Sequence, residues 1–514
     1  MKKSIFIALI VSLGGFLFGF DAGIISGVMT YAGPEFNLSD AQLGWAVSSP
    51  SFAAMFAMLI SGQLSDRIGR KKILIVVAFL YAVSAVMAAY AFSYEMLYIA
   101  RMIGGLAFGA ALILAPTYIA EISLAKKRGQ LVSIQQLNIV LGFFAAFLSN
   151  YLFNEAYTSG ESTFLTEENV WRWMLGVQFI PAIVYFILMF FVPESPRWLF
   201  TKNRNEKATK VLEDMYGKDK ANEEADMIIK SIKESNSKEK GKAKLKDLLN
   251  PSLKFVLTIG LIIGVLQQIT GINAIYFYAT SIFKQTGIGT DASFASGILL
   301  SLTTVAFTFM AMFLIDKIGR RPLMLFGIGG VAISLLICAY GFNQATYELS
   351  PENRKQLKFD GSEKLEQFYG QKFENDLDFK NTMKVSLGNQ VYLKNEGAIL
   401  EAATNINAKI VLIGVLGFIA CFAFSLGPVM WVMLSELFPN KYRGLAIGVI
   451  GFANSFVSWI VQQVFPWELS TLGNALTFFI FGAIALLGFF ILLKILPETK
   501  GKSLEQIEFD LAGS

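Results

Sequence analysis

The sequence lacks histidine entirely and has little charge: its 514 residues include no His, two Cys and 16% charged residues. Without histidine, the chain has no side chain that ordinarily titrates near neutral pH, so carboxylates are the groups left to carry protons within a membrane. Cys338 and Cys421 lie inside apolar runs and are expected to be buried free thiols rather than a disulfide framework. Soluble domains carry about 25% charged residues. This composition therefore indicates a polytopic membrane protein.

Apolar segments recur along the whole chain, and about 20 apolar helical residues are enough to cross the ~30 Å hydrocarbon layer of a bilayer. The run after Met1 is too long for a secretory signal and lacks a small-residue cleavage site, so we expect it to be the first span. Twelve spans are predicted in all, at 4–30, 41–64, 73–93, 97–120, 130–153, 171–192, 253–283, 292–315, 323–342, 408–437, 445–469 and 473–496.

Lysine and arginine gather in alternate connections between these segments. The connections at 66–72 and 316–322 are strongly basic, whereas those at 31–40 and 94–96 contain no Lys or Arg. Because positively charged loops stay on the cytoplasmic side, this asymmetry predicts that both termini are cytoplasmic. The expected location is the cell (inner) membrane.

The chain repeats itself, which predicts its domain organisation. DRIGRKK at 66–72 recurs as DKIGRRP at an offset of 250, and the stretch around Glu121 recurs around Glu436 at an offset of 315. The difference is the length of the polar segment 343–407, which is therefore an insertion on the outer side. We expect an all-α membrane protein of two pseudo-symmetric six-helix halves. The parts are 1–193, a cytoplasmic helical linker at 194–252, 253–497 with the insertion, and a cytoplasmic tail at 498–514.

Several motifs occur in order: GQLSDRIGRKK, PESPRWL, QQITGINAIYFY, GPVMWVMLSELFP and PETKGKSLEQIE. With them the chain resembles the sugar porters of the major facilitator superfamily, which include bacterial sugar–proton symporters and facilitative glucose transporters. The resemblance implies a transporter that moves a monosaccharide by alternating access, without cofactor, metal or chemical reaction. The expected partners are the sugar, protons and the lipid bilayer, with no nucleic acid, and the chain is expected to be monomeric.

A polyol needs hydrogen-bonding side chains within the membrane and an apolar face for its ring. The motif QQITGIN supplies amides well inside segment 253–283, and its Gly271 can loosen the helix there. Bonds between helices are the alternative use of such amides. The resemblance favours sugar binding and implies a set of seven residues: Phe18, Gln136, Gln267, Gln268, Asn273, Trp431 and Asn454.

Two departures from the family pattern leave the identity of the sugar, pentose or hexose, open. The chain has Phe277 and Tyr278 where the family commonly has two tyrosines, and Thr304 where many members have asparagine. Both changes remove hydrogen-bonding capacity from the second half.

Asp21 is the one charged residue between Ser4 and Pro34. A charge at the centre of a spanning helix costs at least ~2.5–3.5 kcal/mol, and Arg101, at a similar depth, is the expected partner. Burial favours the neutral acid whereas a nearby arginine favours the carboxylate, so alternation between these environments would carry a proton. A permanent salt bridge is the alternative. The resemblance favours coupling, because proton symporters of the family have an acid at this position.

Acidic and basic residues pair at predicted cytoplasmic helix ends in both halves. The repetition and the resemblance favour an ionic gate that joins the halves on the inside. The alternative is the general need for basic loops, since exposed ion pairs contribute only about 0–1 kcal/mol each. The predicted gate residues are Asp66, Arg70, Glu121, Arg128, Glu194 and Arg197, with Asp316, Arg320, Glu436 and Arg443.

The expected function is proton-coupled import of a monosaccharide. The nearest alternative is a passive facilitator with the same site, which only the behaviour of Asp21 separates from a symporter. A sugar receptor that keeps the fold is a third reading. The short tail after PETKGKSLEQIEFD argues against it.

Overall fold

The computed structural model describes residues 2–124, 127–160, 162–238, 245–352, 357–438 and 440–500. It is built almost wholly of helices and contains twelve candidate membrane spans, as the hydropathy pattern predicts. The first six spans are α1 (Lys2–Glu35), α2 (Asp40–Ile68), α3 (Arg70–Ala89), α4 (Tyr94–Ile122), α5 (Arg128–Thr158) and the pair α6 (Val170–Gly176) and α7 (Phe179–Phe191).

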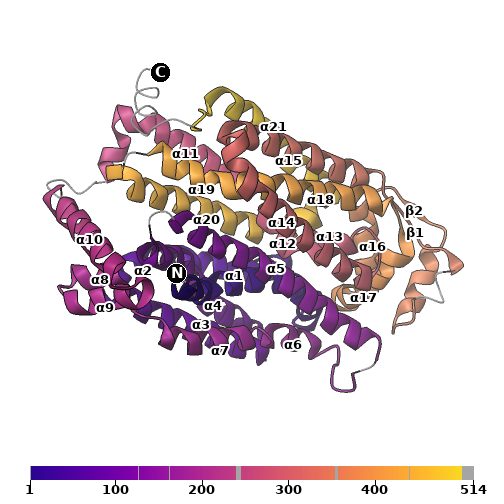
Figure 1. Ribbon diagram of the computed structural model, residues 1–514. Coiled ribbons are helices and arrows are strands. Elements are labelled where there is room, and N and C mark those ends of the chain that lie inside the picture. Colours follow the sequence, from indigo (N-terminus) through magenta and orange to yellow (C-terminus); the bar gives the residue numbers. More distant parts are fainter. Residues whose placement is uncertain are drawn as a thin grey trace.

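The last six spans include two interrupted ones. They are α11 (Pro251–Ile269) continuing as α12 (Ile272–Phe277) and α13 (Ala279–Lys284), then α14 (Thr290–Ile318), α15 (Arg320–Asn343), α18 (Ala408–Phe424) continuing as α19 (Leu426–Leu437), α20 (Asn440–Thr471) and α21 (Gly473–Ile495). In Figure 1 the indigo and purple helices form one bundle and the orange and yellow helices form a second beside it.

The linker that connects the two halves lies at one end of the molecule, and the insertion lies at the opposite end (Figure 1). The linker forms α8 (Pro196–Thr201), α9 (Asn205–Tyr216), α10 (Lys218–Lys238) and the 3-10 helix η2 (Leu245–Leu249), with a small core around Trp198 and Leu212. We call the end with these helices and the connections 66–72 and 316–322 the basic face, and the opposite end the insertion face.

The insertion is a small folded unit with its own core around Tyr347 and Phe379. Its antiparallel sheet has the order β2-β1-β3, and residues 353–356 lie outside the described part. The elements are β1 (Thr346–Glu348), η4 (Ser362–Phe368), β2 (Lys372–Phe373), α16 (Asp376–Leu387), α17 (Asn389–Ala403) and β3 (Thr404–Asn405).

The repeated sequence motif produces the same local structure in both halves. Gly69 between α2 and α3 and Gly319 between α14 and α15 have φ values of 119° and 105°, which side chains rarely adopt. A Cβ on Gly69 would meet Glu194, and one on Gly319 would meet Glu498. The glycines therefore let the PES and PET motifs reach the start of the next helix.

Candidate functional site

The seventh span is broken where three of the predicted sugar-binding amides lie. Gly271 has a φ of 88°, in the left-handed region, and separates α11 from α12. Gln267 and Gln268 form the last turn of α11, and Asn273 lies in the first turn of α12. The break predicted from QQITGIN is present, and it gathers the three amides.

These amides hydrogen-bond to one another and to Asn454 of α20. Gln268 Nε2 donates to Asn454 Oδ1 (3.2 Å), and Asn273 Nδ2 donates to Gln268 Oε1 (2.9 Å). Asn454 Nδ2 donates to Gln267 Oε1 (2.8 Å). All four side chains were predicted from sequence, and we call them the amide network. Donors and acceptors that bond one another in this way can be exchanged for the hydroxyls of a bound polyol.

The network extends along α20 through residues that the sequence reading missed. Asn273 Nδ2 donates to Ser458 Oγ (2.6 Å), and Gln462 Nε2 donates to the same oxygen (2.8 Å). Ser458 and Gln462 follow Asn454 at intervals of four residues, the spacing of one helix face, which could have identified them. Tyr278 completes the chain, because its hydroxyl donates to the Gln462 carbonyl (3.0 Å).

Gln136 comes from the other half and lies on the face of α5 that is turned towards the seventh span. Phe143 is two turns further along the same face, and its ring packs on that of Tyr276 at 4.7 Å between centroids. Gln136 itself is exposed, closer to the basic face. Phe18 packs on Phe108 of α4 at 4.8 Å and is half-buried.

Trp431 lies in α19, the second part of another broken span. The helix is interrupted at Ser425, and the Leu426 carbonyl accepts a hydrogen bond from Gln267 Nε2 (3.0 Å). The indole is 45% exposed, and a Cβ added at Gly451 of α20 would lie 3.8 Å from it. Trp431 thus presents an open aromatic face on the basic side of the amide network.

Asp21 and Arg101 meet inside the N-terminal half, as predicted. Both are buried, at 5% and 2% exposed, and Arg101 Nη1 lies 3.5 Å from Asp21 Oδ1. The shorter bond of the guanidinium is from Nε to the Ala46 carbonyl (2.8 Å). Gln178, which is 3% exposed, contributes a further polar side chain beside Asp21. Sequence reading missed Gln178, although it is an isolated amide in the apolar run 170–192.

The two halves are joined on the insertion side of the molecule. Ser26 Oγ and Thr280 Oγ1 are 2.9 Å apart, Asn154 donates to Asp291 (2.6 Å), and Ser48 donates to Gln463 (2.8 Å). Further bonds between the halves, from Ser51 to Gln462, from Gln463 to the Ala41 carbonyl and from Ser470 to Asp40, lie on the insertion side of the weak Ser455–Met58 contact. The site is therefore closed towards the insertion face.

The predicted gate residues of the first half form a cluster within that half. Arg70 pairs with Asp66 (2.6 Å) and with Glu121 (3.1 Å). Glu194 accepts a bond from the backbone N–H of Lys71 (3.0 Å). Arg128 is exposed and donates to the Ala120 carbonyl (3.2 Å), and Arg197 is exposed as well.

The second half contains the equivalent cluster. Arg320 pairs with Glu436 (2.9 Å), and its backbone N–H donates to Glu498 (3.1 Å), a member that the sequence reading missed. Arg443 donates to the Phe438 carbonyl (3.2 Å), and the side chain of Asp316 lies outside the described residues. Each described cluster holds the ends of its own half together. A latch between the halves remains a prediction for a different conformation.

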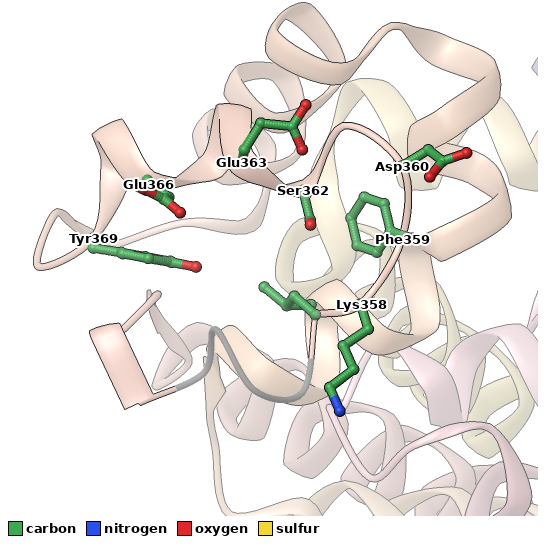
Figure 2. Close-up of a pocket in the computed structure, with 8 residues that line it drawn as sticks. Lys358, Phe359, Asp360, Ser362, Glu363, Glu366 and Tyr369 are labelled. Atoms are coloured by element: carbon green, nitrogen blue, oxygen red, sulfur yellow. The ribbon is translucent and has the colours of Figure 1, made fainter.

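The insertion touches both halves. Asn474 N donates to Asp376 Oδ2 (3.1 Å), which anchors it to α21. Lys394 pairs with Glu167 of the N-terminal half (3.0 Å), and the hydrogen bond and the negative charge of this partner raise the pKa of Lys394. Figure 2 shows a pocket in the insertion, lined by residues between Leu357 and Tyr369. None of them is a predicted site residue.

In the described part of the chain, no group of three or more His, Cys, Asp and Glu residues could hold a metal ion.

Comparison with known proteins places this geometry among transporters. A family model described as "Sugar (and other) transporter" matches residues 7–352 and 383–511, leaving out part of the insertion. The arabinose-proton symporter of Bacillus subtilis is 33% identical over 506 residues, covering 98% of this chain and 94% of the relative. The D-xylose-proton symporter of Escherichia coli is 31% identical over 535 aligned positions, with 98% and 94% covered. A structure titled as the inward open conformation of the E. coli xylose transporter XylE matches with a TM-score of 0.74 at 27% identity, covering 98% and 99%.

Proposed function

Because this chain belongs to the sugar porters of the major facilitator superfamily, which are transporters and not enzymes, we propose that it imports a monosaccharide together with protons. The single observation that carries the proton coupling is the buried Asp21–Arg101 pair. An intramembrane carboxylate is costly to keep charged, and its presence marks a functional site.

The sugar binds at the amide network. Gln136 faces the sugar from the other half, and Trp431 lies on the side of the sugar towards the basic face. The network offers three carboxamide groups from the broken seventh span and one from α20. A pyranose ring bonds these amides through its hydroxyls and places its apolar face against the indole. The relatives named as arabinose and xylose symporters support a pentose or hexose substrate.

The basic face is cytoplasmic in the inner membrane, and the monomeric chain is in a conformation open to the inside. Positive charge at this face supports the orientation. The closure at the insertion face and the likeness to a structure titled inward open support the state. In the opposite state the Arg70 and Arg320 clusters join the halves on the inside.

Asp21 couples the proton to the sugar because its proton affinity differs between two environments, one with Arg101 close and one with Arg101 drawn away. With Arg101 close, the carboxylate is stabilised and releases its proton; with Arg101 drawn away in a desolvated helix bundle, the neutral acid is favoured. The rocking of the halves alternates these conditions. A passive facilitator is the second candidate function, and in it Asp21 and Arg101 form a permanent structural pair.

The test is uptake of labelled D-xylose and D-glucose into proteoliposomes, with and without an inward proton gradient, for the wild type and Asp21→Asn. We expect accumulation above equilibrium only with the gradient, and its loss in Asp21→Asn while equilibrative exchange persists. The asparagine keeps the size of the side chain but cannot bind or release a proton.

Asp40→Asn is the matched control, because Asp40 accepts a bond from Ser470 at the insertion face and is distant from the buried pair in sequence. It is expected to accumulate sugar like the wild type. Equilibration without accumulation in the wild type, unchanged by the gradient, would instead identify a facilitator. Entry of neither sugar would overturn the substrate class.

A further inference from the structure

Two prolines lie inside spanning helices at the interface between the halves, Pro50 in α2 and Pro466 in α20. Proline has no backbone N–H, so in a helix the carbonyl four residues earlier loses its usual donor. The carbonyls affected are those of Ala46 and Gln462. Both residues are completely buried, where an unpaired carbonyl is costly.

Each of these carbonyls is taken by a side chain of the proposed site. Arg101 Nε donates to the Ala46 carbonyl (2.8 Å), and the Tyr278 hydroxyl donates to the Gln462 carbonyl (3.0 Å). The first donor is the partner of Asp21, and the second belongs to the broken seventh span that holds the amide network. The two prolines thus create acceptors for one residue of the proton pair and one residue beside the sugar site.

The two proline-containing segments are also bonded to each other. Ser51, next to Pro50, donates to Gln462 Oε1 (3.0 Å) across the boundary between the halves. Gln462 Nε2 in turn donates to Ser458, which accepts from Asn273 of the amide network (2.8 and 2.6 Å). Hydrogen-bond networks and rigid helices that have two arrangements can carry coupling between sites, and a continuous path of contacts runs here from Asp21 to the amide network.

We propose that Pro50 and Pro466 are positioning residues for coupling, because the carbonyls they free hold Arg101 and Tyr278 and connect the proton pair to the sugar site. This inference rests on the proposed function. Arg101 has two acceptors, the Asp21 carboxylate at 3.5 Å and the Ala46 carbonyl at 2.8 Å. Protonation of Asp21 removes the charged acceptor, and the guanidinium is then held by α2 alone.

When Asp21 is protonated, the loss of its bond to Arg101 changes the force on α2 at Ala46. The helical bond from residue 50 to the Ala46 carbonyl is missing, so the segment from Ala46 to Ser51 bends more easily than an intact helix. Ser51 carries that movement to Gln462 and the amide network. The titratable groups along this path are Asp21, Arg101 and Tyr278. Tyr81 of α3 lies near Asp21, and Tyr185 of α7 lies near Tyr81.

Another helix supplies the matched control. Pro116 lies inside α4 and frees the Leu112 carbonyl, but no hydrogen bond from a described side chain goes to that carbonyl. The variants Pro50→Ala and Pro116→Ala therefore restore the same backbone N–H in two spanning helices of the same half. Only in Pro50→Ala does the new donor compete with Arg101.

The experiment measures sugar accumulation driven by a proton gradient, and the pH dependence of the KM for sugar exchange, in proteoliposomes. We expect Pro50→Ala to exchange sugar within about twofold of the wild-type rate but to lose accumulation and the pH dependence of KM, a factor of two being only about 0.4 kcal/mol. Pro116→Ala keeps both. A merely structural role would lower the exchange rate without changing the pH profile.

Wild-type behaviour in Pro50→Ala, in both accumulation and pH profile, would overturn the inference while leaving the symporter intact. A wild type that never accumulates sugar would remove both proposals. If Pro50→Ala does not fold, Ser51→Ala leaves both prolines in place and removes only the hydroxyl link to Gln462. Its KM is expected to lose its pH dependence, and an unchanged profile would overturn the inference.

Discussion

Buried amides in the spanning helices differ in how far their partners are backbone or side-chain groups. Asn150 donates to the backbone carbonyl of Ile24 (3.0 Å), a bond that fastens α5 to α1. Gln268 instead bonds three other side-chain amides, those of Gln267, Asn454 and Asn273. A backbone partner is fixed, whereas side-chain amides can turn towards hydroxyls of a ligand. The first kind stabilises the fold and the second kind binds.

This difference predicts opposite results for two similar substitutions. Gln268→Ala is expected to raise the KM for sugar about tenfold or more, since one or two hydrogen bonds of about 0.5–1.5 kcal/mol each are lost. Asn150→Ala is expected to lower the thermal unfolding midpoint with little change in KM. Uptake kinetics and thermal unfolding in detergent measure both. Equal effects of the two variants on KM would contradict the division.

Sequence reading finds site residues well where the side chain itself is unusual for its surroundings. Asp21, Arg101 and the four amides of the network are polar groups in apolar runs, and the structure brings them into two groups. It fails where the functional atom belongs to the backbone. The carbonyl of Ala46 gives no signal in its own residue, because its availability depends on a proline four positions later and on a helix 55 residues away.

At the scale of the helix, function is concentrated where helical hydrogen bonding is interrupted. The seventh span breaks at Gly271 and the tenth at Ser425, and residues at both breaks bond Gln267 or its neighbours. Interrupted backbone is tolerated in a membrane only where protein or a polar cavity satisfies it. The breaks therefore both require and create a polar centre between the halves.

Gly271→Ala tests the break in the seventh span. The substitution forces an alanine into the left-handed region, at about 1–2 kcal/mol, and places a Cβ 3.0 Å from the ring of Phe481. We expect a lower unfolding midpoint and slower uptake. Gly62→Ala in α2 is the control, because its Cβ meets nothing within 4 Å, and helix propensity favours alanine by about 1 kcal/mol. A Gly271→Ala protein as stable and active as the control would contradict this role.

Hydropathy predicts the spans but only part of their interruptions. It reports which residues suit a lipid environment, so all twelve spans follow from it. It carries no information on hydrogen-bond continuity. Gly271 is identifiable because glycine is the residue that accepts a positive φ. The break at Ser425 also has a signal in the sequence, because Pro428 cannot donate to the carbonyl of Phe424, the last residue of α18.

For the molecule as a whole, the two faces are built from different interactions. Hydrogen bonds between small and amide side chains join the halves at the insertion face, together with the exposed Lys394–Glu167 pair. Multiply bonded arginine clusters occupy the basic face, each within one half. Under the proposed alternating access, the first set breaks when the clusters of the two halves come together.

A cross-link at the insertion face tests this requirement. Asn389 of α17 donates to Asn37 of the N-terminal half (3.2 Å), so cysteines at these two positions can be joined by a short thiol cross-linker. With Cys338 and Cys421 replaced, we expect the cross-link to abolish sugar uptake, and its reductive cleavage to restore uptake. The reason is that the outward-open state must separate the two residues.

The control cross-link joins the insertion to its own half. Gln285 of the loop after α13 donates to Glu396 of α17 (3.3 Å), and both residues move with the C-terminal half. Gln285→Cys with Glu396→Cys is expected to transport normally when cross-linked. Full transport by the cross-linked Asn37→Cys, Asn389→Cys protein would show that the insertion does not move relative to the N-terminal half.

The architecture could be predicted because the chain carries two copies of the same motifs, and the position of the insertion follows from the shift between them. Its internal structure could not. The strands contain two or three residues each, too few for an alternating pattern to appear. They form a sheet because β2 and β3 pair with opposite edges of β1.

The placement of the insertion also makes the conformation of this transporter accessible to an external reagent. On the proposed orientation, its contact with the region of Glu167 forms a composite epitope that exists only while the halves are closed on that side. An antibody fragment selected against this joined surface would stop sugar entry without crossing the membrane or competing with the sugar. The same reagent, labelled with a fluorophore, would report the fraction of transporters in the inward-open state on living cells.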